Sequence, residues 1–234
     1  MQLFYNSEIN ENTSQFSFSK EESKHIIKVL RKKVGDTMHI TNGKGWLFSA
    51  KISSDNIKNC VAQVTNKEFQ DQPKYHLHLA VAPTKMNDRY EWFLEKATEI
   101  GIQEITPIIC DHSERKVIKP ERFEKILQSA MKQSLSCYLP KLNQAIAFNN
   151  FITHDFKSDL FIAHCEENNR TALKQALKLN QDTTILIGPE GDFSSKEIAL
   201  ALENNYIPVT LGNTRLRTET AAIVACHSVA FVNE

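Results

Sequence analysis

One stretch near the C-terminal end, residues 184–222, limits the folds open to this chain more than any other. Two short apolar runs, 184–187 and 207–211, each end in a turn that contains glycine, and a helical pattern lies between them. Glycine at a strand end lets the backbone approach a ligand closely, because no Cβ is in the way. The stretch therefore predicts two strands of one sheet whose ends form a small-molecule pocket.

Strands and helices alternate from residue 76 to the C-terminal end. The expected strands are 76–82, 105–109, 160–163, 184–187 and 207–211, and the expected helices are 87–100, 120–136, 171–179, 194–205 and 219–231. Asn87 is expected to cap the first helix, and Ser194 opens a capping box with Glu197. Such alternation is typical of a mostly parallel sheet covered on both faces, with ligands at the carboxyl ends of its strands. The predicted fold class is α/β.

Residues 3–66 show a different pattern, with apolar residues at period two and a hairpin turn at 41–45. They predict a small β-barrel or curled sheet. A polar segment with a proline, 69–74, follows, and we place the domain boundary there. Residues 1–72 are therefore expected to form one domain and residues 73–234 another.

One helix interrupts the N-terminal strands, beginning with a capping box at 19–22. Its expected buried side comprises Ile26, Ile27, Val29 and Leu30. Lys24, Lys28 and Arg31 follow at helical spacing on another side, and form a basic ridge in a chain of zero formal net charge. Both a solvated helix face and a phosphate-contacting ridge fit this pattern.

Metal and disulfide sites are not favoured. The five cysteines are scattered and never spaced Cys-x-x-Cys, and His76 and His78 have no third ligand at a recognisable spacing. No window has the length and apolarity of a membrane span, and the first residues lack the pattern of a secretory signal. We expect a cytoplasmic protein without a metal.

The glycine turn 188–191 matches neither common phosphate-binding fingerprint. It lacks the Gly-Lys-Ser/Thr ending of a P-loop, and it is not Gly-x-Gly-x-x-Gly. It also follows the fourth strand of its domain, whereas the Rossmann loop follows the first. A small adenosine ligand held by backbone groups remains open.

Four motifs together resemble the RsmE family of 16S ribosomal RNA uracil-N3 methyltransferases, of the SPOUT superfamily. They are Ile-Gly-Pro-Glu-Gly-Asp-Phe-Ser at 187–194, Leu-Gly at 211–212 with Leu-Arg-Thr-Glu-Thr-Ala at 216–221, Lys85 to Gly101, and His25-x-x-x-Val-Leu-Arg. The resemblance implies a PUA-like barrel that helps to dock RNA, followed by an α/β domain with a deep trefoil knot. It also implies a homodimer.

The resemblance implies S-adenosylmethionine (SAM) as cofactor and a uracil N3 of 16S ribosomal RNA in the 30S subunit, of the position-1498 type, as target. The implied cofactor-binding residues are Ala163, His164, Ile187, Gly188, Pro189, Glu190, Gly191, Leu211, Gly212, Leu216 and Arg217. Arg217 is the first candidate for catalysis, and Glu219 or Glu190 for the base. Glu219 alternatively serves as a first-turn carboxylate favoured by the helix dipole. The expected RNA-binding residues are Lys24, Lys28, Arg31, Lys85 and Arg89.

The chain departs from the family pattern at several positions. Asp192 stands where a second glycine is usual after Gly191, and an arginine that is usual near the start is missing. The acid usual before Gln133 and the arginine usual shortly after it, within 135–137, are also missing. Two other functions stay open. One is another SPOUT RNA methyltransferase, acting on transfer RNA or a ribose 2′-OH, and the other is a non-catalytic RNA-binding protein of ribosome assembly.

Overall fold

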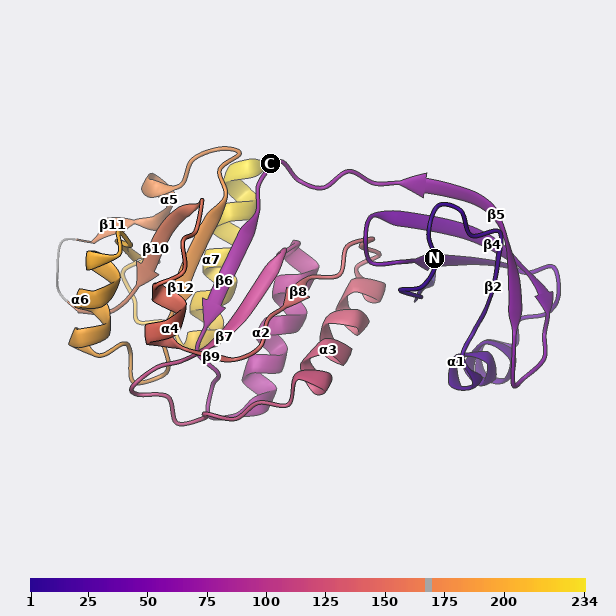
Figure 1. The fold of residues 1–234 in the computed structure, drawn as a ribbon, viewed down its shortest axis with the longest axis horizontal. Helices are drawn as coiled ribbons and strands as arrows, with labels where there is room; N and C mark the ends of the chain where they lie inside the picture. The colour runs from indigo at the N-terminus through magenta and orange to yellow at the C-terminus, as the bar shows by residue number, and fades with distance from the viewer. Residues whose placement is uncertain (167–169) are drawn as a thin grey trace. The chain divides into compact units, whose positions relative to one another are not determined.

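The computed structural model describes residues 1–166 and 170–234 (Figure 1). The chain forms two compact units. The first comprises residues 1–72 and 131–139, and the second comprises residues 73–130 and 140–234. The segment 131–139 thus lies outside the range that the sequence analysis assigns to the first domain. It joins that unit because its backbone pairs with the turn at residues 42–45, where Lys44 and Tyr138 form an antiparallel bridge.

The first unit is built on a five-stranded sheet. Its strands are β1 (Leu3–Tyr5), β2 (Gln15–Ser17), β3 (Thr37–Thr41), β4 (Trp46–Ser54) and β5 (Val61–Phe69), in the order β1-β3-β4-β5-β2. β1 pairs with β3 in parallel and the other pairs are antiparallel. Apolar residues at alternate positions, such as Ile40 opposite Phe48, fill the inside of the sheet. The expected strand-rich N-terminal unit is confirmed.

The helix of this unit begins as expected but changes its pitch. Ser19 caps α1 (Lys20–Lys24) by accepting a hydrogen bond from the Glu22 N–H, at 3.2 Å. The chain continues as the π-helix η1 (His25–Val29). Ile26 is fully buried, but Val29 is 65% exposed, so its expected place on the buried side was wrong. The wider π turn is the reason, because it rotates later residues away from the face that an α-helix would bury.

The second unit is built on a parallel sheet, as predicted. Its strands are β6 (Leu77–Val81), β7 (Glu104–Ile109), β8 (Lys141–Leu142), β9 (Ile146–Ala147), β10 (Asp159–Ala163), β11 (Thr171–Ala172), β12 (Thr183–Ile187) and β13 (Ile207–Thr210). The order is β11-β13-β10-β12-β6-β7-β8, and β9 also pairs with β7. β10 lies between β12 and β13, so the two glycine turns flank the end of a third strand.

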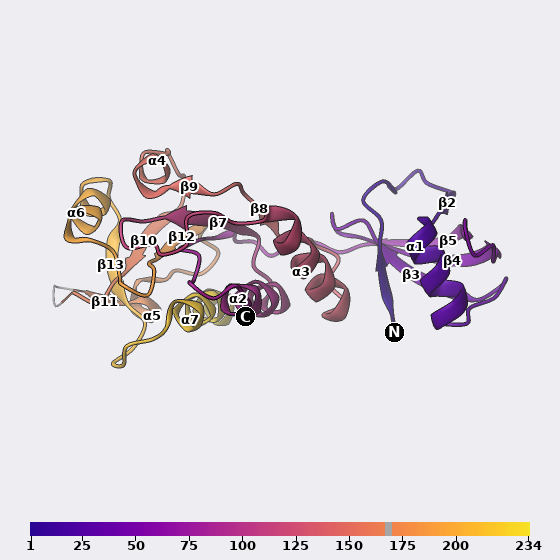
Figure 2. The ribbon, with the colours of Figure 1, turned by 90° about the horizontal axis from the view of Figure 1, so that it is seen from below.

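Helices cover both faces of this sheet (Figure 2). They are α2 (Asn87–Ile100), α3 (Pro120–Gln133, whose last residues belong to the first unit), α4 (Phe148–Ile152), α5 (Leu173–Ala176), α6 (Ser195–Glu203) and α7 (Thr218–Asn233). Figure 2 shows α2 and α7 on one face and α4 and α6 on the other. The expected two-sided layering is confirmed.

Two local predictions need correction, and three short elements were not predicted. The helix expected at 171–179 is a two-residue strand followed by the single turn α5, because Thr171 and Ala172 pair with β13 and sheet pairing overrides helix propensity. Met86, not Asn87, is the N-cap residue of α2. The short elements β8, β9 and α4 were not predicted, since two to five residues carry no readable period.

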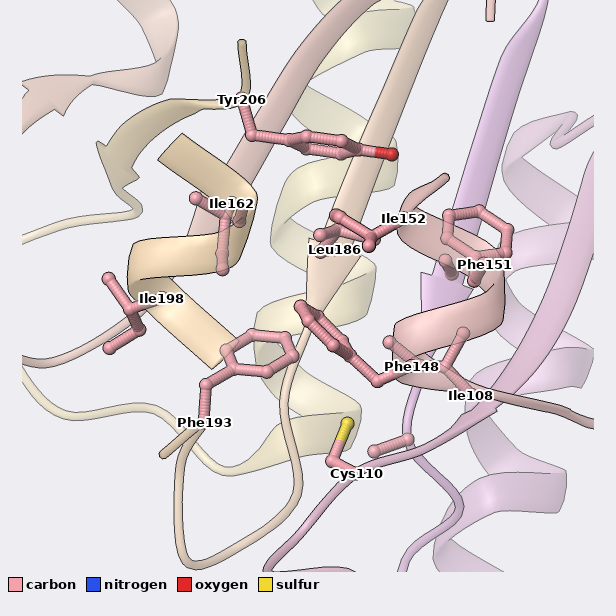
Figure 3. Packing of buried hydrophobic residues seen from close by; sticks show 13 residues of the cluster. Ile108, Cys110, Phe148, Phe151, Ile152, Ile162, Leu186, Phe193, Ile198 and Tyr206 are labelled. Carbon is pink, nitrogen blue, oxygen red and sulfur yellow. The ribbon is translucent and has the colours of Figure 1, made fainter. Parts of the chain in front are cut away.

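A core cluster of the second unit lies directly behind the loop that follows β12. Phe193 packs against Phe148, with ring centroids 5.5 Å apart, and Figure 3 shows both rings beside Ile198 and Leu186. The predicted capping box of α6 is confirmed, since Ser194 and Glu197 exchange hydrogen bonds between side chain and backbone. The loop is therefore fixed at its C-terminal end by an aromatic anchor and a helix cap. None of the helices in residues 1–166 and 170–234 combines the length and the apolar composition of a membrane span.

Candidate active site

Three neighbouring parallel strands end at the same edge of the second sheet. β10 ends at Ala163, β12 at Ile187 and β13 at Thr210, and the register pairs Ala163 with both Ile187 and Val209. Because parallel strands align their carboxyl ends, the loops that follow them converge. The glycine turns therefore meet beside the loop of residues 164–166.

Two adjoining cavities of about 360 and 260 Å³ lie among these loops. Ala163, Cys165 and Leu216 line both of them. The larger cavity also contains His164, Leu211 and Gly212 in its wall, and the smaller contains Ile187, Gly188, Pro189, Glu190 and Arg217. The structure thus brings together the residues expected at the cofactor site, except Gly191, which lines neither cavity.

The loop after β12, residues 188–193, is bonded to several distant segments. Thr218 Oγ1 donates to the Gly188 carbonyl at 3.0 Å, and the Lys85 N–H donates to Glu190 Oε1 at 3.0 Å. His112 Nδ1 lies 3.1 Å from the Gly191 carbonyl and 3.0 Å from that of Asp192. A Cβ on Gly188 would lie 3.0 Å from the Phe193 ring, so a side chain here would force the ring to shift by a few tenths of an ångström.

The loop after β13, residues 211–216, is held by fewer bonds. Thr210 Oγ1 donates to the Gly212 carbonyl at 2.8 Å, and Gly212 has φ 148°, in the region that favours glycine. A Cβ on Gly212 would meet no atom within 4 Å. Arg217 ends this loop as the N-cap residue of α7 and is exposed at the smaller cavity. Its guanidinium is therefore available to a bound ligand.

Glu219 lies in the first turn of α7 but lines neither cavity. Its side chain is 8% exposed, and Oε1 is 3.9 Å from Arg89 Nε. Oε2 is buried without a hydrogen-bond partner. A carboxylate in this state is stabilised by the helix N-terminus and can accept a further donor.

The loop after β10 contributes an imidazole and a thiol. Burial lowers the pKa of His164, whose two ring nitrogens are buried without a hydrogen-bond partner. Burial, followed by the charge of Asp192, raises the pKa of the Cys165 thiol. At neutral pH the imidazole is therefore neutral and the thiol protonated, so neither is an activated nucleophile.

The expected RNA-binding residues fall into two groups. Lys24, Lys28 and Arg31 are exposed in the first unit, but Arg31 lies beyond the helix with φ 56°, so the three do not form one helical ridge. In the second unit Lys85 Nζ pairs with Glu114 at 2.8 Å, which raises the pKa of Lys85, and Arg89 faces Glu219. These two cations are engaged by carboxylates.

Sequence reasoning missed residues that support the site from outside the motifs. Arg115 donates through Nη2 to the Lys85 carbonyl at 2.7 Å, His112 contacts the loop after β12, and Arg215 lines both cavities. Only Arg215 had a sequence signal, since it lies between the glycine turn and Arg217. Among the described residues, no group of three or more His, Cys, Asp or Glu side chains is arranged to hold a metal ion.

Comparison with known proteins identifies the family. Residues 70–230 match a family model described as an RNA methyltransferase domain, and residues 18–65 match an RNA methyltransferase PUA domain. The chain is 32% identical over 222 residues to ribosomal RNA small subunit methyltransferase E of Buchnera aphidicola, covering 91% of this chain and 86% of that protein.

Two solved structures resemble the whole chain. A structure from Porphyromonas gingivalis described as a "probable rRNA-methyltransferase" has a TM-score of 0.92 at 39% identity, over 100% of this chain and 98% of the other. A Legionella pneumophila protein in complex with the bound cofactor SAM has a TM-score of 0.87 at 27% identity, over 99% and 97%. The chain therefore belongs to the RNA methyltransferase family, among the ribosomal RNA small subunit methyltransferase E proteins.

Proposed function

We propose that this chain transfers the methyl group of S-adenosylmethionine to N3 of a uracil in 16S ribosomal RNA of the small subunit. The target uracil is of the position-1498 type. One observation carries the proposal. The strand-end loops that contain the family motifs converge on two adjoining cavities, whose walls include almost every expected cofactor-binding residue. Family membership supplies the reaction class, and a relative with this fold has been solved with SAM.

The cavities suit such a cofactor in size and chemistry. Their volumes are of the order found for small-molecule sites. Gly188 and Gly212 expose backbone groups without a Cβ, and the carboxylate of Glu190 lies at the smaller cavity, where it favours a cationic ligand. We assign cofactor binding to the expected residues, with Gly191 acting through the conformation of its loop.

When bound, SAM supplies an electrophilic methyl group on a sulfonium sulfur. The chain's own tasks are then to align the uracil and to remove its N3 proton. We assign the first task to Arg217, whose exposed guanidinium can donate to the uracil carbonyl oxygens as negative charge develops there.

We assign proton acceptance to Glu219, whose buried Oε2 has no hydrogen-bond donor. Because Glu219 lines neither cavity, this role requires that the bound uracil reach the first turn of α7. Glu190 is the rival, since it lines the smaller cavity, but its Oε1 already accepts from the Lys85 backbone. Glu219→Gln should lower methyl transfer about 100-fold or more, while Glu190→Gln chiefly weakens cofactor binding. A loss of methyl transfer in Glu190→Gln but not in Glu219→Gln would instead identify Glu190 as the base.

The exposed cations Lys24, Lys28 and Arg31 are proposed to contact RNA phosphates. Reversal of Lys28 and Arg31 to glutamate should weaken binding to 30S subunits and reduce its salt dependence, because fewer counterions are released. Unchanged binding would show that these cations belong to a solvated surface and do not contact RNA. Lys85 and Arg89 are proposed as RNA contacts that exchange their carboxylate partners for phosphates on binding.

Three further properties are proposed on the basis of the family. They are a deep trefoil knot in the second unit, a homodimer and a cytoplasmic place of action beside ribosomal subunits. Sedimentation equilibrium tests the dimer, and an experimental structure traced from end to end tests the knot.

The decisive experiment uses SAM labelled with tritium in its methyl group, purified 30S subunits that lack the modification, and transfer RNA in parallel. Label should enter the 30S subunit and appear as 3-methyluridine after digestion to nucleosides. Label in transfer RNA or in a 2′-O-methyl nucleoside would indicate another SPOUT activity. Binding of 30S subunits without any transfer would indicate a non-catalytic assembly protein.

A further inference from the structure

Asp192 has an unusual backbone conformation for a residue with a side chain. Its φ is 64°, in the left-handed region where glycine is the common occupant. Asp and Asn enter this region more readily than other residues because their short polar side chains bond to nearby backbone. An interaction of the Asp192 carboxylate is therefore expected to offset the backbone cost.

Both carboxylate oxygens of Asp192 accept backbone hydrogen bonds. Oδ1 accepts from the adjacent Phe193 N–H at 2.9 Å, which is a local contact. Oδ2 accepts from the Cys165 N–H at 2.7 Å, across a sequence separation of 27 residues. Hydrogen bonds to an ionised carboxylate are stronger than neutral ones. The second bond joins the loop after β10 to the loop after β12.

The two joined loops both form walls of the cavities. Cys165 lines both cavities and Asp192 lines the smaller one. On its other side, the backbone of the Asp192 loop lies beside His112 Nδ1, which contacts the carbonyls of Gly191 and Asp192. The Asp192 loop is therefore held from one side and itself holds Cys165 on the other.

We propose that Asp192 is a positioning residue that fastens the loop after β10 to the loop after β12, and thereby keeps their shared wall in its cofactor-binding geometry. The inference rests on the proposed SAM site. Asp192 has no part in proton or methyl transfer. A glycine at this position would satisfy the backbone but would leave the Cys165 N–H without its acceptor.

The test measures the bond and its effect on the cofactor separately. In the cofactor-free protein, Asp192→Gly should accelerate hydrogen exchange of the Cys165 amide about tenfold or more, because the bond that protects it is lost. Alkylation of the Cys165 thiol should also accelerate, and it can be read alone because the other four cysteines are buried. Calorimetry should show SAM binding about tenfold weaker.

Asp182→Gly is the matched control. Asp182 Oδ1 also accepts a backbone hydrogen bond, from the His76 N–H at 2.8 Å, but this lies at the opposite end of β12. The control should leave Cys165 exchange and SAM affinity unchanged. For Asp192→Gly, the KM for 30S subunits and kcat at saturating SAM should stay close to those of the parent, as a positioning role at the cofactor wall requires.

Two more variants separate the bond from backbone strain. Asp192→Asn keeps one acceptor oxygen and should recover part of the SAM affinity. Asp192→Ala loses the bond and keeps the left-handed strain, so it should melt below Asp192→Gly. Unchanged Cys165 exchange in Asp192→Gly would overturn the proposal, as would faster exchange with unchanged SAM affinity. A parent protein that binds no SAM would instead refute the proposed function, while the exchange result would still decide whether the bond holds the loop.

Discussion

The two glycine-bearing loops beside the cavities are held in opposite ways. The loop after β12 is bonded to residues from four other segments, Lys85, His112, Cys165 and Thr218. In the described part of the chain, the loop after β13 has side-chain bonds only within its own turn, at Thr210 and Gly212, and it leaves residues 212–215 exposed. One wall of the site is therefore preorganised by its contacts, while the other presents exposed cations to a ligand.

The largest effect is expected at the end of the sparsely bonded loop. Arg217→Ala should lower methyl transfer to 30S subunits about 100- to 1,000-fold at saturating SAM, because a donor to the developing negative charge is lost. Arg217→Lys should restore little, since a single ammonium cannot reproduce the planar fork. Full transfer by Arg217→Ala would show that this loop carries no catalytic group.

The well-bonded loop should tolerate a side chain poorly. In Gly188→Ala the new Cβ would lie 3.0 Å from the Phe193 ring and 3.2 Å from its backbone nitrogen. Overpacking of this kind costs about 1–3 kcal/mol of unfolding free energy. Urea denaturation of the variant measures this loss of unfolding free energy. A loss below about 0.5 kcal/mol would mean that the loop adjusts to the new methyl group more readily than its hydrogen bonds suggest.

Gly212→Ala is the matched variant in the other loop. Its Cβ has open space, so the cost in stability comes from φ 148° alone and should be on the order of 1 kcal/mol. The new methyl group takes up space in the larger cavity. The loss in SAM binding free energy should therefore exceed the loss in unfolding free energy. Equal losses of stability in the two glycine variants would remove the proposed difference between the loops.

The smallest effect is expected at the third loop, after β10, where protonation of His164 makes the unfolding free energy depend on pH. His164 has a folded-state pKa below its ordinary value of 6.5, so the unfolded chain binds a proton first as pH falls. Its contribution to stability is therefore lost progressively below about pH 6.5. His164→Asn should flatten the pH dependence of the unfolding free energy there. Burial lowers the pKa of His78 to about 4, so His78 should account for a larger share of the pH dependence of the unfolding free energy than His164.

Much of this architecture was predictable because its signals are local. The parallel sheet, the glycine turns and the Ser194 capping box follow from periodicity and from the conformational needs of single residues. The one-turn α5 was not predictable, because pairing with β13 decides it. Val29 was misplaced because nothing in its neighbourhood indicates a π turn.

The candidate site shows the same limit. The motifs indicated which residues gather at the strand ends, but the contacts that hold them come from far along the chain. His112 reaches Gly191, and Asp192 reaches Cys165, through hydrogen bonds that no spacing rule anticipates. The resemblance also suggested Lys85 and Arg89 as RNA-binding residues, but it did not indicate that each lies beside a carboxylate in the folded chain.

The discontinuous first unit has a consequence for synthesis. Gly45 donates to the Cys137 carbonyl at 2.9 Å, and Leu139 donates to the Gly43 carbonyl at 3.0 Å. A chain that emerges from the ribosome N-terminus first cannot make these bonds until Leu139 has left the exit tunnel. By then β6, α2 and β7 of the second unit have also been synthesised. We therefore expect the second unit to begin folding before the first unit is complete. A fragment that ends at residue 72 should fold less stably than the complete first unit, because it lacks these bonds.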